Sequence, residues 1–144
     1  MRVTDRPNFP PNNATVILLR TDEDVVRVRK TVREYLVSGG FSLIDQTKMV
    51  TAASELARNT LSYGGGGDAH VSEVYSASRR GVRVSFIDSG PGIADIDVAL
   101  SDGYTTGNGM GLGLGGAKRL ADEFDLTSVL GKGTTVVITK WKLF

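Results

Sequence analysis

A glycine-rich run over residues 102–116 is the feature that most constrains how this chain can fold. Glycine occupies every second position from 107 to 115, and a run so dense predicts a loop with exposed backbone N–H groups. A flexible linker would carry serine or other polar residues between its glycines, whereas this run carries Met110, Leu112 and Leu114. We therefore expect a loop with apolar anchors that leads into a helix. Its N–H groups and the helix dipole favour an anion such as phosphate.

Two familiar nucleotide-binding motifs do not account for the run. Gly111-x-Gly113-x-x-Gly116 has the spacing of the dinucleotide fingerprint, but that motif follows a hydrophobic strand and precedes an acidic residue about 20 positions later. Here the preceding segment 95–108 is polar, and the segment 129–137 contains no carboxylate. The Walker pattern G-x-x-x-x-G-K-[ST] does not occur in the sequence. A bound nucleotide would need another architecture.

Length and composition limit the remaining function classes. A chain of 144 residues fits one domain, large enough to bury about two-thirds of its unfolded surface. The net charge of +1 gives no reason to expect a nucleic-acid partner, and the lack of cysteine excludes disulfides and thiolate metal sites. No apolar run approaches the roughly 18 residues that span a bilayer. We expect a cytoplasmic protein with no membrane partner.

The first half of the chain reads as a strand and two helices. Residues 1–13 contain three prolines and are expected to form a loose tail, and residues 14–144 a single folded domain. A short apolar strand is expected at 15–19. Two capping pairs then predict helix starts: Thr21 with Asp24, and Ser42 with Asp45. The residues expected to face inward are Val25, Val28, Val32 and Leu36 in the first helix, and Ile44, Val50, Ala53, Ala57 and Leu61 in the second.

Strand patterns dominate the second half. Strands at 69–77 and 82–87 are expected to pair through a turn near 79–81, and strands at 126–130 and 134–141 to form a closing hairpin. Because the strands come in hairpin pairs with helices between the pairs, we expect a two-layer α/β sandwich. Its sheet would be mixed and mostly antiparallel, with the helices on one face. The helix after the glycine run is expected to carry an apolar stripe of Ala117, Leu120, Ala121 and Phe124.

Three further segments carry candidate site residues. Glu55 and Asn59 are four residues apart, so they share one face of a helix that could hold a metal, although this spacing is also common on solvated helices. Asp88 ends an apolar strand and could accept a hydrogen bond from the adenine amino group, leaving GTP unpaired. Turn formation alone would also explain the Gly90-Pro-Gly92 segment that follows. Thr135 could add a second adenine contact, or could reflect β propensity alone.

Taken in order, these segments resemble the GHKL ATPase superfamily, which contains gyrase, heat-shock chaperones, histidine kinases and the MutL proteins. The resemblance covers residues 53–137 and rests on Glu55-x-x-x-Asn59, Asp88-x-Gly-x-Gly92, Gly109-x-Gly-x-Gly113 and Gly133-Thr. It implies a Bergerat fold that binds ATP and Mg²⁺ beneath a lid at 95–108. The nucleotide-binding residues it implies are Asn59, as the magnesium ligand, and Asp88, Gly90, Gly92, Gly109, Gly111, Leu112, Gly113 and Thr135.

Within that superfamily, the chain is similar to the small serine kinases that regulate bacterial sigma factors by partner switching. Larger members carry a following domain, and His70, the single histidine, does not resemble a phosphoacceptor. Segments 54–59 and 117–124 are most similar to the stressosome switch kinases, the RsbT-like group. This resemblance implies a serine/threonine kinase in which Glu55 is the general base. It also implies STAS-domain substrates and activation of a PP2C-type phosphatase.

Two other functions are compatible with the same residues. The chain could be an anti-sigma factor or another ATP-dependent docking protein, in which nucleotide binding switches the affinity for a sigma factor. It could also be a degenerate relative that binds no nucleotide. Loss of phosphoryl transfer without loss of ATP binding would separate a kinase from a docking protein.

Overall fold

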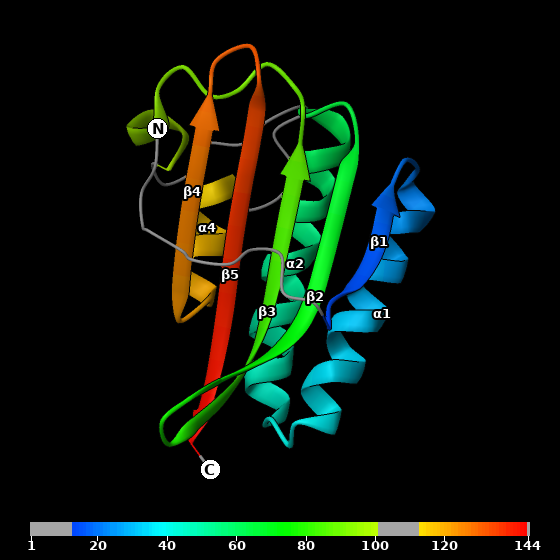
Figure 1. The fold of residues 1–144 in the computed structure, drawn as a ribbon, viewed down its shortest axis with the longest axis vertical. Coiled ribbons are helices and arrows are strands. Elements are labelled where there is room, and N and C mark those ends of the chain that lie inside the picture. The colour runs from blue at the N-terminus through cyan, green and yellow to red at the C-terminus, as the bar shows by residue number, and fades with distance from the viewer. Residues whose placement is uncertain (1–12, 101–112, 144) are drawn as a thin grey trace.

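The computed structural model describes residues 13–100 and 113–143 (Figure 1). The predicted tail, apart from Asn13, and Gly109, Gly111 and Leu112 of the glycine run lie outside the described residues. The elements are, in order, β1 (Thr15–Leu19), α1 (Asp22–Ser38), α2 (Leu43–Ser62), β2 (Gly67–Ser76), β3 (Arg79–Asp88), α3 (Ile96–Ala99), α4 (Gly113–Leu120), β4 (Glu123–Val129) and β5 (Gly133–Leu143).

The strands form a five-stranded sheet in the order β1-β2-β3-β5-β4. Helices α1, α2 and α4 lie behind one face of it in Figure 1, which confirms the expected two-layer α/β sandwich with helices on one face. Every pair of neighbouring strands is antiparallel, so the mixed pairing that we allowed for does not occur among the described strands. This sheet places the end of β3 beside the start of β5, where Asp88 pairs with Thr134.

The long helices begin where the capping pairs predicted. Asp24 Oδ2 accepts hydrogen bonds from the backbone N–H groups of Arg20 and Thr21, at 2.8 and 2.9 Å, and fixes the start of α1. Ser42 Oγ accepts from the Asp45 N–H at 3.1 Å and caps α2. The four inward residues predicted for α1 are all buried, and Gly40, with φ of 77°, turns the chain after it.

Three expectations about individual residues are wrong. Ile44 is 68% exposed, because it lies in the first turn of α2, before the part of that helix that is buried in the core. The turn between β2 and β3 is at residues 77–78, so Arg79 and Gly81 belong to β3. Phe124 belongs to β4 and pairs with Ile138, because α4 already ends at Leu120 and strand alternation sets the direction of Phe124.

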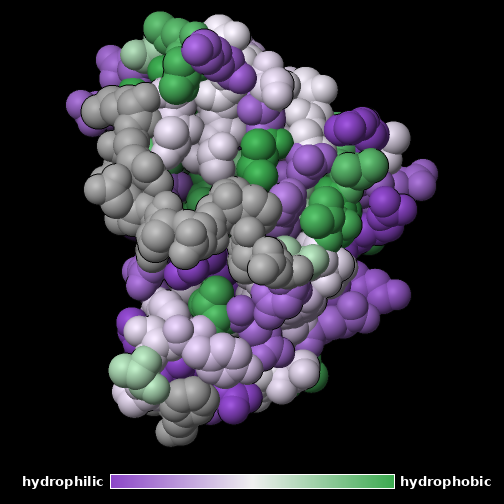
Figure 2. Space-filling model, in the orientation of Figure 1, coloured by the Kyte–Doolittle hydropathy of each residue, from purple (hydrophilic) through white to green (hydrophobic). Residues whose placement is uncertain are grey.

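The two faces of the sheet differ in character. Val84, Phe86, Leu126 and Ile138 are buried in the core, as are the inward residues of α1 and α2. Figure 2 shows a largely polar opposite face, with apolar side chains over the edge strand β1, where Val16 and Leu18 are about half exposed. No helix of the described residues is long and apolar enough to cross a membrane.

Candidate nucleotide-binding site

A pocket lies between the C-terminal half of α2 and the edge where β3 ends and β5 begins. Its walls are mostly apolar, and a few polar groups converge on it, as is typical of sites for small ligands. Asn59 comes from α2, Asp88 from the end of β3, and Leu114 from the first turn of α4. The other lining residues are Leu56, Thr60, Tyr63, Phe86, Ile93, Ala99, Thr134 and Val136.

The Asp88 carboxylate is held by one of its two oxygens. Oδ1 accepts hydrogen bonds from the Gly90 N–H at 2.9 Å and from the Thr134 N–H at 3.2 Å. Within the described residues no hydrogen bond reaches Oδ2, which leaves this oxygen as an acceptor for a ligand in the pocket. Burial raises the pKa of the Asp88 carboxyl above its ordinary value, and the two backbone N–H groups act in the opposite direction.

Glycines allow the backbone to pack closely around this carboxylate. A Cβ atom at Gly64 would lie 2.4 Å from Asp88 Cγ, and one at Gly133 would lie 2.1 Å from the Asp88 carbonyl oxygen. Gly90 packs against Gly64 in the same way, since its Cβ would lie 2.8 Å from Gly64 Cα. Gly92 has φ of 79°, a conformation that other residues seldom adopt. The Gly-x-Gly segment after Asp88 therefore serves backbone geometry and close packing around the acceptor.

Helix α2 supplies the two residues predicted for metal binding and proton transfer. Asn59 lines the pocket, and Glu55, 5% exposed, is not among the lining residues and lies about one turn earlier on the helix. Within the described residues no group of three His, Cys, Asp or Glu side chains could hold a metal ion. An Asn amide oxygen completed by phosphate oxygens and water suits Mg²⁺, which keeps several waters and prefers oxygen ligands. The donor set therefore fits magnesium bound together with a nucleotide.

The threonine that lines this pocket is Thr134. Thr134 and Val136 line the pocket, and Thr135 is not among its lining residues, because alternate residues of a strand face opposite sides of the sheet. The Thr134 hydroxyl lies 3.0 Å from Ser128 Oγ, and the backbone N–H of Thr134 donates to Asp88 Oδ1. Strand periodicity could have identified it, since counting back by twos from the core residue Ile138 leads to Thr134. The sequence offered no comparable signal for Thr60 or Tyr63, which also line the pocket.

Part of the glycine run is seen at the start of α4. Gly113 has φ of 71° and is the first residue of α4, and Leu114 is 6% exposed and lines the pocket. The expected role of Leu114 as an apolar anchor is thereby confirmed. The start of a helix presents backbone N–H groups without intrahelical partners, and here it lies beside the pocket that contains Asp88.

Comparison with known proteins agrees with this geometry. Residues 44–143 match the family described as histidine kinase-, DNA gyrase B- and HSP90-like ATPases. The chain is 40% identical over 130 residues to the serine/threonine-protein kinase RsbT of Bacillus subtilis strain 168, covering 90% of this chain and 98% of RsbT.

A solved structure has a similar fold. It is the crystal structure of the RsbU and RsbW domains of Rv1364c from Mycobacterium tuberculosis, with a TM-score of 0.62 and 23% identity. The match covers 90% of this chain and 32% of that larger one. Both the family match and the extent of the similarity to RsbT lead to one assignment: the chain belongs to the RsbT family of serine/threonine-protein kinases, within the histidine kinase-, gyrase B- and HSP90-like ATPases.

Proposed function

We propose that this protein transfers the γ-phosphoryl group of ATP to a serine or threonine of a STAS-domain regulatory protein, with Mg²⁺ as cofactor. One observation carries the proposal. A single pocket brings together Asp88, with one carboxylate oxygen unused by the described residues, Asn59 on α2, and the first turn of α4. These are the groups needed to bind a base, a metal ion and phosphates in a chain that is similar to a kinase over nearly its whole length.

Each group has a defined task in this proposal. Asp88 Oδ2 accepts a hydrogen bond from the adenine amino group, and the apolar walls of the pocket pack against the base. Asn59 binds Mg²⁺, which neutralises charge on the phosphates. Backbone N–H groups at the start of α4 donate to phosphate oxygens, because phosphoryl transfer depends mainly on positioning and charge stabilisation.

Glu55 is the proposed general base that removes the proton from the attacking hydroxyl. Its buried carboxylate lies about one helical turn from Asn59 on α2, which supports a role beside the proposed metal ligand. The glycines at 109 and 111 and Leu112 remain proposed phosphate-loop residues. Partner proteins are proposed as STAS-domain substrates and a PP2C-type phosphatase in the cytoplasm.

The direct test is phosphoryl transfer from labelled ATP with Mg²⁺ to STAS proteins encoded in the same genome. We expect label on a serine or threonine, and we expect Glu55→Gln to remove transfer while ATP affinity remains within about twofold. ATP binding without label on any of these proteins would refute the kinase proposal. If Glu55→Gln also preserved the biological output, ATP-dependent docking, including capture of a sigma factor, would be the better description.

A further inference from the structure

Helix α4 cannot hold its position through its own stability. It has eight residues, three of them glycine, and each glycine costs about 1 kcal/mol relative to alanine. Isolated helices shorter than about 12–15 residues are marginal in water even with favourable sequences. The place of α4 must therefore be set by its contacts with the rest of the domain. Near its start these contacts are apolar, through the buried residues Leu114 and Ala117.

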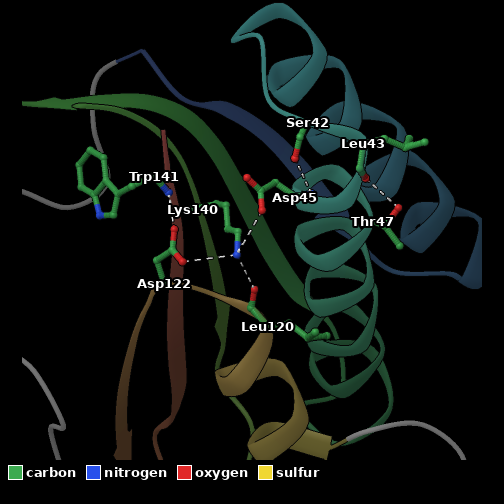
Figure 3. A network of polar contacts seen from close by, with 8 residues as sticks. All are labelled: Ser42, Leu43, Asp45, Thr47, Leu120, Asp122, Lys140 and Trp141. Carbon is green, nitrogen blue, oxygen red and sulfur yellow. Dashed lines mark hydrogen bonds and ion pairs between the residues drawn. The ribbon is translucent and has the colours of Figure 1, made fainter. Parts of the chain in front are cut away.

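At the other end of α4 the contact is a buried ammonium group. Lys140 comes from β5 and is 6% exposed. Figure 3 shows its Nζ between the end of α4 and the first turn of α2. Nζ donates to the Leu120 carbonyl oxygen at 3.1 Å and to Asp122 Oδ1 at 3.4 Å, and it lies 3.9 Å from Asp45 Oδ1.

The charges around Lys140 are balanced in a way that favours this position. A cation at the last carbonyls of a helix interacts favourably with its dipole, and two carboxylates compensate the buried charge. Asp122 is itself fixed, because its Oδ2 accepts from the Trp141 N–H at 2.7 Å. Asp45 lies in the capped first turn of α2, beside Ser42. One ammonium group thus joins α4, β5 and α2.

The two helices that Lys140 joins are the two that carry the proposed kinase chemistry. Helix α2 bears Glu55 and Asn59, and α4 begins at Gly113 beside the pocket. An eight-residue helix is about 12 Å long, so a small rotation about its far end displaces its start. Lys140 itself does not line the pocket.

We propose that Lys140 is a positioning residue that fixes α4 relative to α2 and so aligns the N–H groups at the start of α4 with the phosphates of ATP. The inference rests on the proposed function, because it assumes that this end of α4 meets phosphate. It predicts a defect confined to ligands that carry phosphates. Adenosine would be bound by the Asp88 part of the pocket and would not depend on Lys140.

The test compares ATP and adenosine as ligands of the full chain. Lys140→Met removes the charge and retains the aliphatic length. Lys140→Arg keeps the cation, and Lys48→Met makes the same change at an exposed lysine of α2. ATP affinity is measured by calorimetry and adenosine affinity by ligand-observed NMR. For Lys140→Met we expect ATP affinity to fall by about tenfold or more. Adenosine affinity should change by less than about twofold. Lys140→Arg should recover most of the ATP affinity, and Lys48→Met should resemble wild type.

Equal losses for both ligands, or no loss for ATP in a folded Lys140→Met protein, would overturn the inference. If Lys140→Met does not fold, Asp45→Asn decides the question, since it weakens only the link to α2 at a partly exposed carboxylate. A loss confined to ATP would support positioning, and unchanged ATP affinity would refute it. Failure of the proposed function would look different. It would appear as ATP binding by the wild-type protein without phosphoryl transfer, or as wild-type protein that binds ATP no better than adenosine.

Discussion

Replacing Asp88 with asparagine should weaken ATP binding and raise the melting temperature of the free protein. Oδ1 of Asp88 accepts from the Gly90 and Thr134 N–H groups, and the asparagine oxygen can take over both bonds. Its amide nitrogen must then occupy the position of Oδ2. A hydrogen-bond donor would face the adenine amino group, which is also a donor, so the interaction is lost and is not merely weakened.

The size of the effect follows from the charge on the acceptor. A hydrogen bond to a charged group contributes about 1.5–3 kcal/mol, which corresponds to roughly a 10- to 150-fold loss of ATP affinity. Guanine presents an acceptor where adenine presents its amino group, so the asparagine amide can donate to it. GTP affinity should therefore be retained or rise, and the ratio of ATP affinity to GTP affinity should fall.

The stability of the free protein should change in the opposite direction. Because burial raises the pKa of Asp88, ionisation of this carboxyl costs free energy in the folded state. That cost is fully present above the folded pKa and declines to zero as the pH falls below the pKa of the unfolded chain. Asparagine carries no charge at any pH. The melting temperature of Asp88→Asn should exceed that of wild type near neutral pH, and the difference should shrink as the pH falls through the pKa of Asp88.

Calorimetric titration with ATP and GTP, together with melting curves between about pH 4 and 8, measures both effects. ATP affinity within about twofold of wild type would refute the assignment of Asp88 as the adenine acceptor. A lower melting temperature at neutral pH, with the difference growing towards acid, would refute the argument from burial.

Four further substitutions test the packing of the site. Thr134→Val should weaken ATP binding several-fold, and Thr135→Val should leave it near wild type, because only Thr134 lines the pocket; the two ATP affinities are compared directly. Gly133→Ala should destabilise the protein by about 1–3 kcal/mol in urea unfolding, because Gly133 has φ of 132° and a Cβ there would overlap the Asp88 carbonyl. Tyr63→Phe should cost about 1 kcal/mol in the same assay, since the Tyr63 hydroxyl donates to the Gly92 carbonyl at 3.2 Å. Unchanged unfolding free energies would contradict the last two.

The sequence was most informative where a local rule has one structural outcome. The capping pairs at Thr21 and Ser42 placed both helix starts, and Asp88 after an apolar strand did lie in a pocket. Prediction failed where a residue fits both the helical period and a strand. Phe124 follows Leu120 at helical spacing but lies in a strand, because only the pairing of β4 with β5 decides its environment. Strand pairing also decides which of Thr134 and Thr135 lines the pocket, since a one-residue shift in a strand reverses the face.

No local pattern could have predicted the role of Lys140. Its neighbours in space are Leu120, Asp122 and Asp45, and the last of these is far away in the sequence. From the sequence alone, Lys140 is expected to be an exposed charged residue of the last strand. It is buried only because the sheet, α2 and α4 come together around it. The sequence could therefore indicate the groups that we propose to contact a nucleotide, but it could not indicate Lys140, which we propose to fix their spacing.

The glycine content of α4 explains why this helix needs the contact with the buried Lys140. Helix α4 packs against α2, and its three glycines, Gly113, Gly115 and Gly116, are all buried. The same glycines remove the intrinsic stability that would keep so short a helix in place. A functional site that breaks a local rule must be stabilised elsewhere, and here the described contacts are Leu114 and Ala117 near the start of α4 and Lys140 at its end. A helix held at both ends in this way can present its N–H groups in a fixed direction. Phosphate binding needs that fixed direction, since donors that must first reorganise stabilise charge less well.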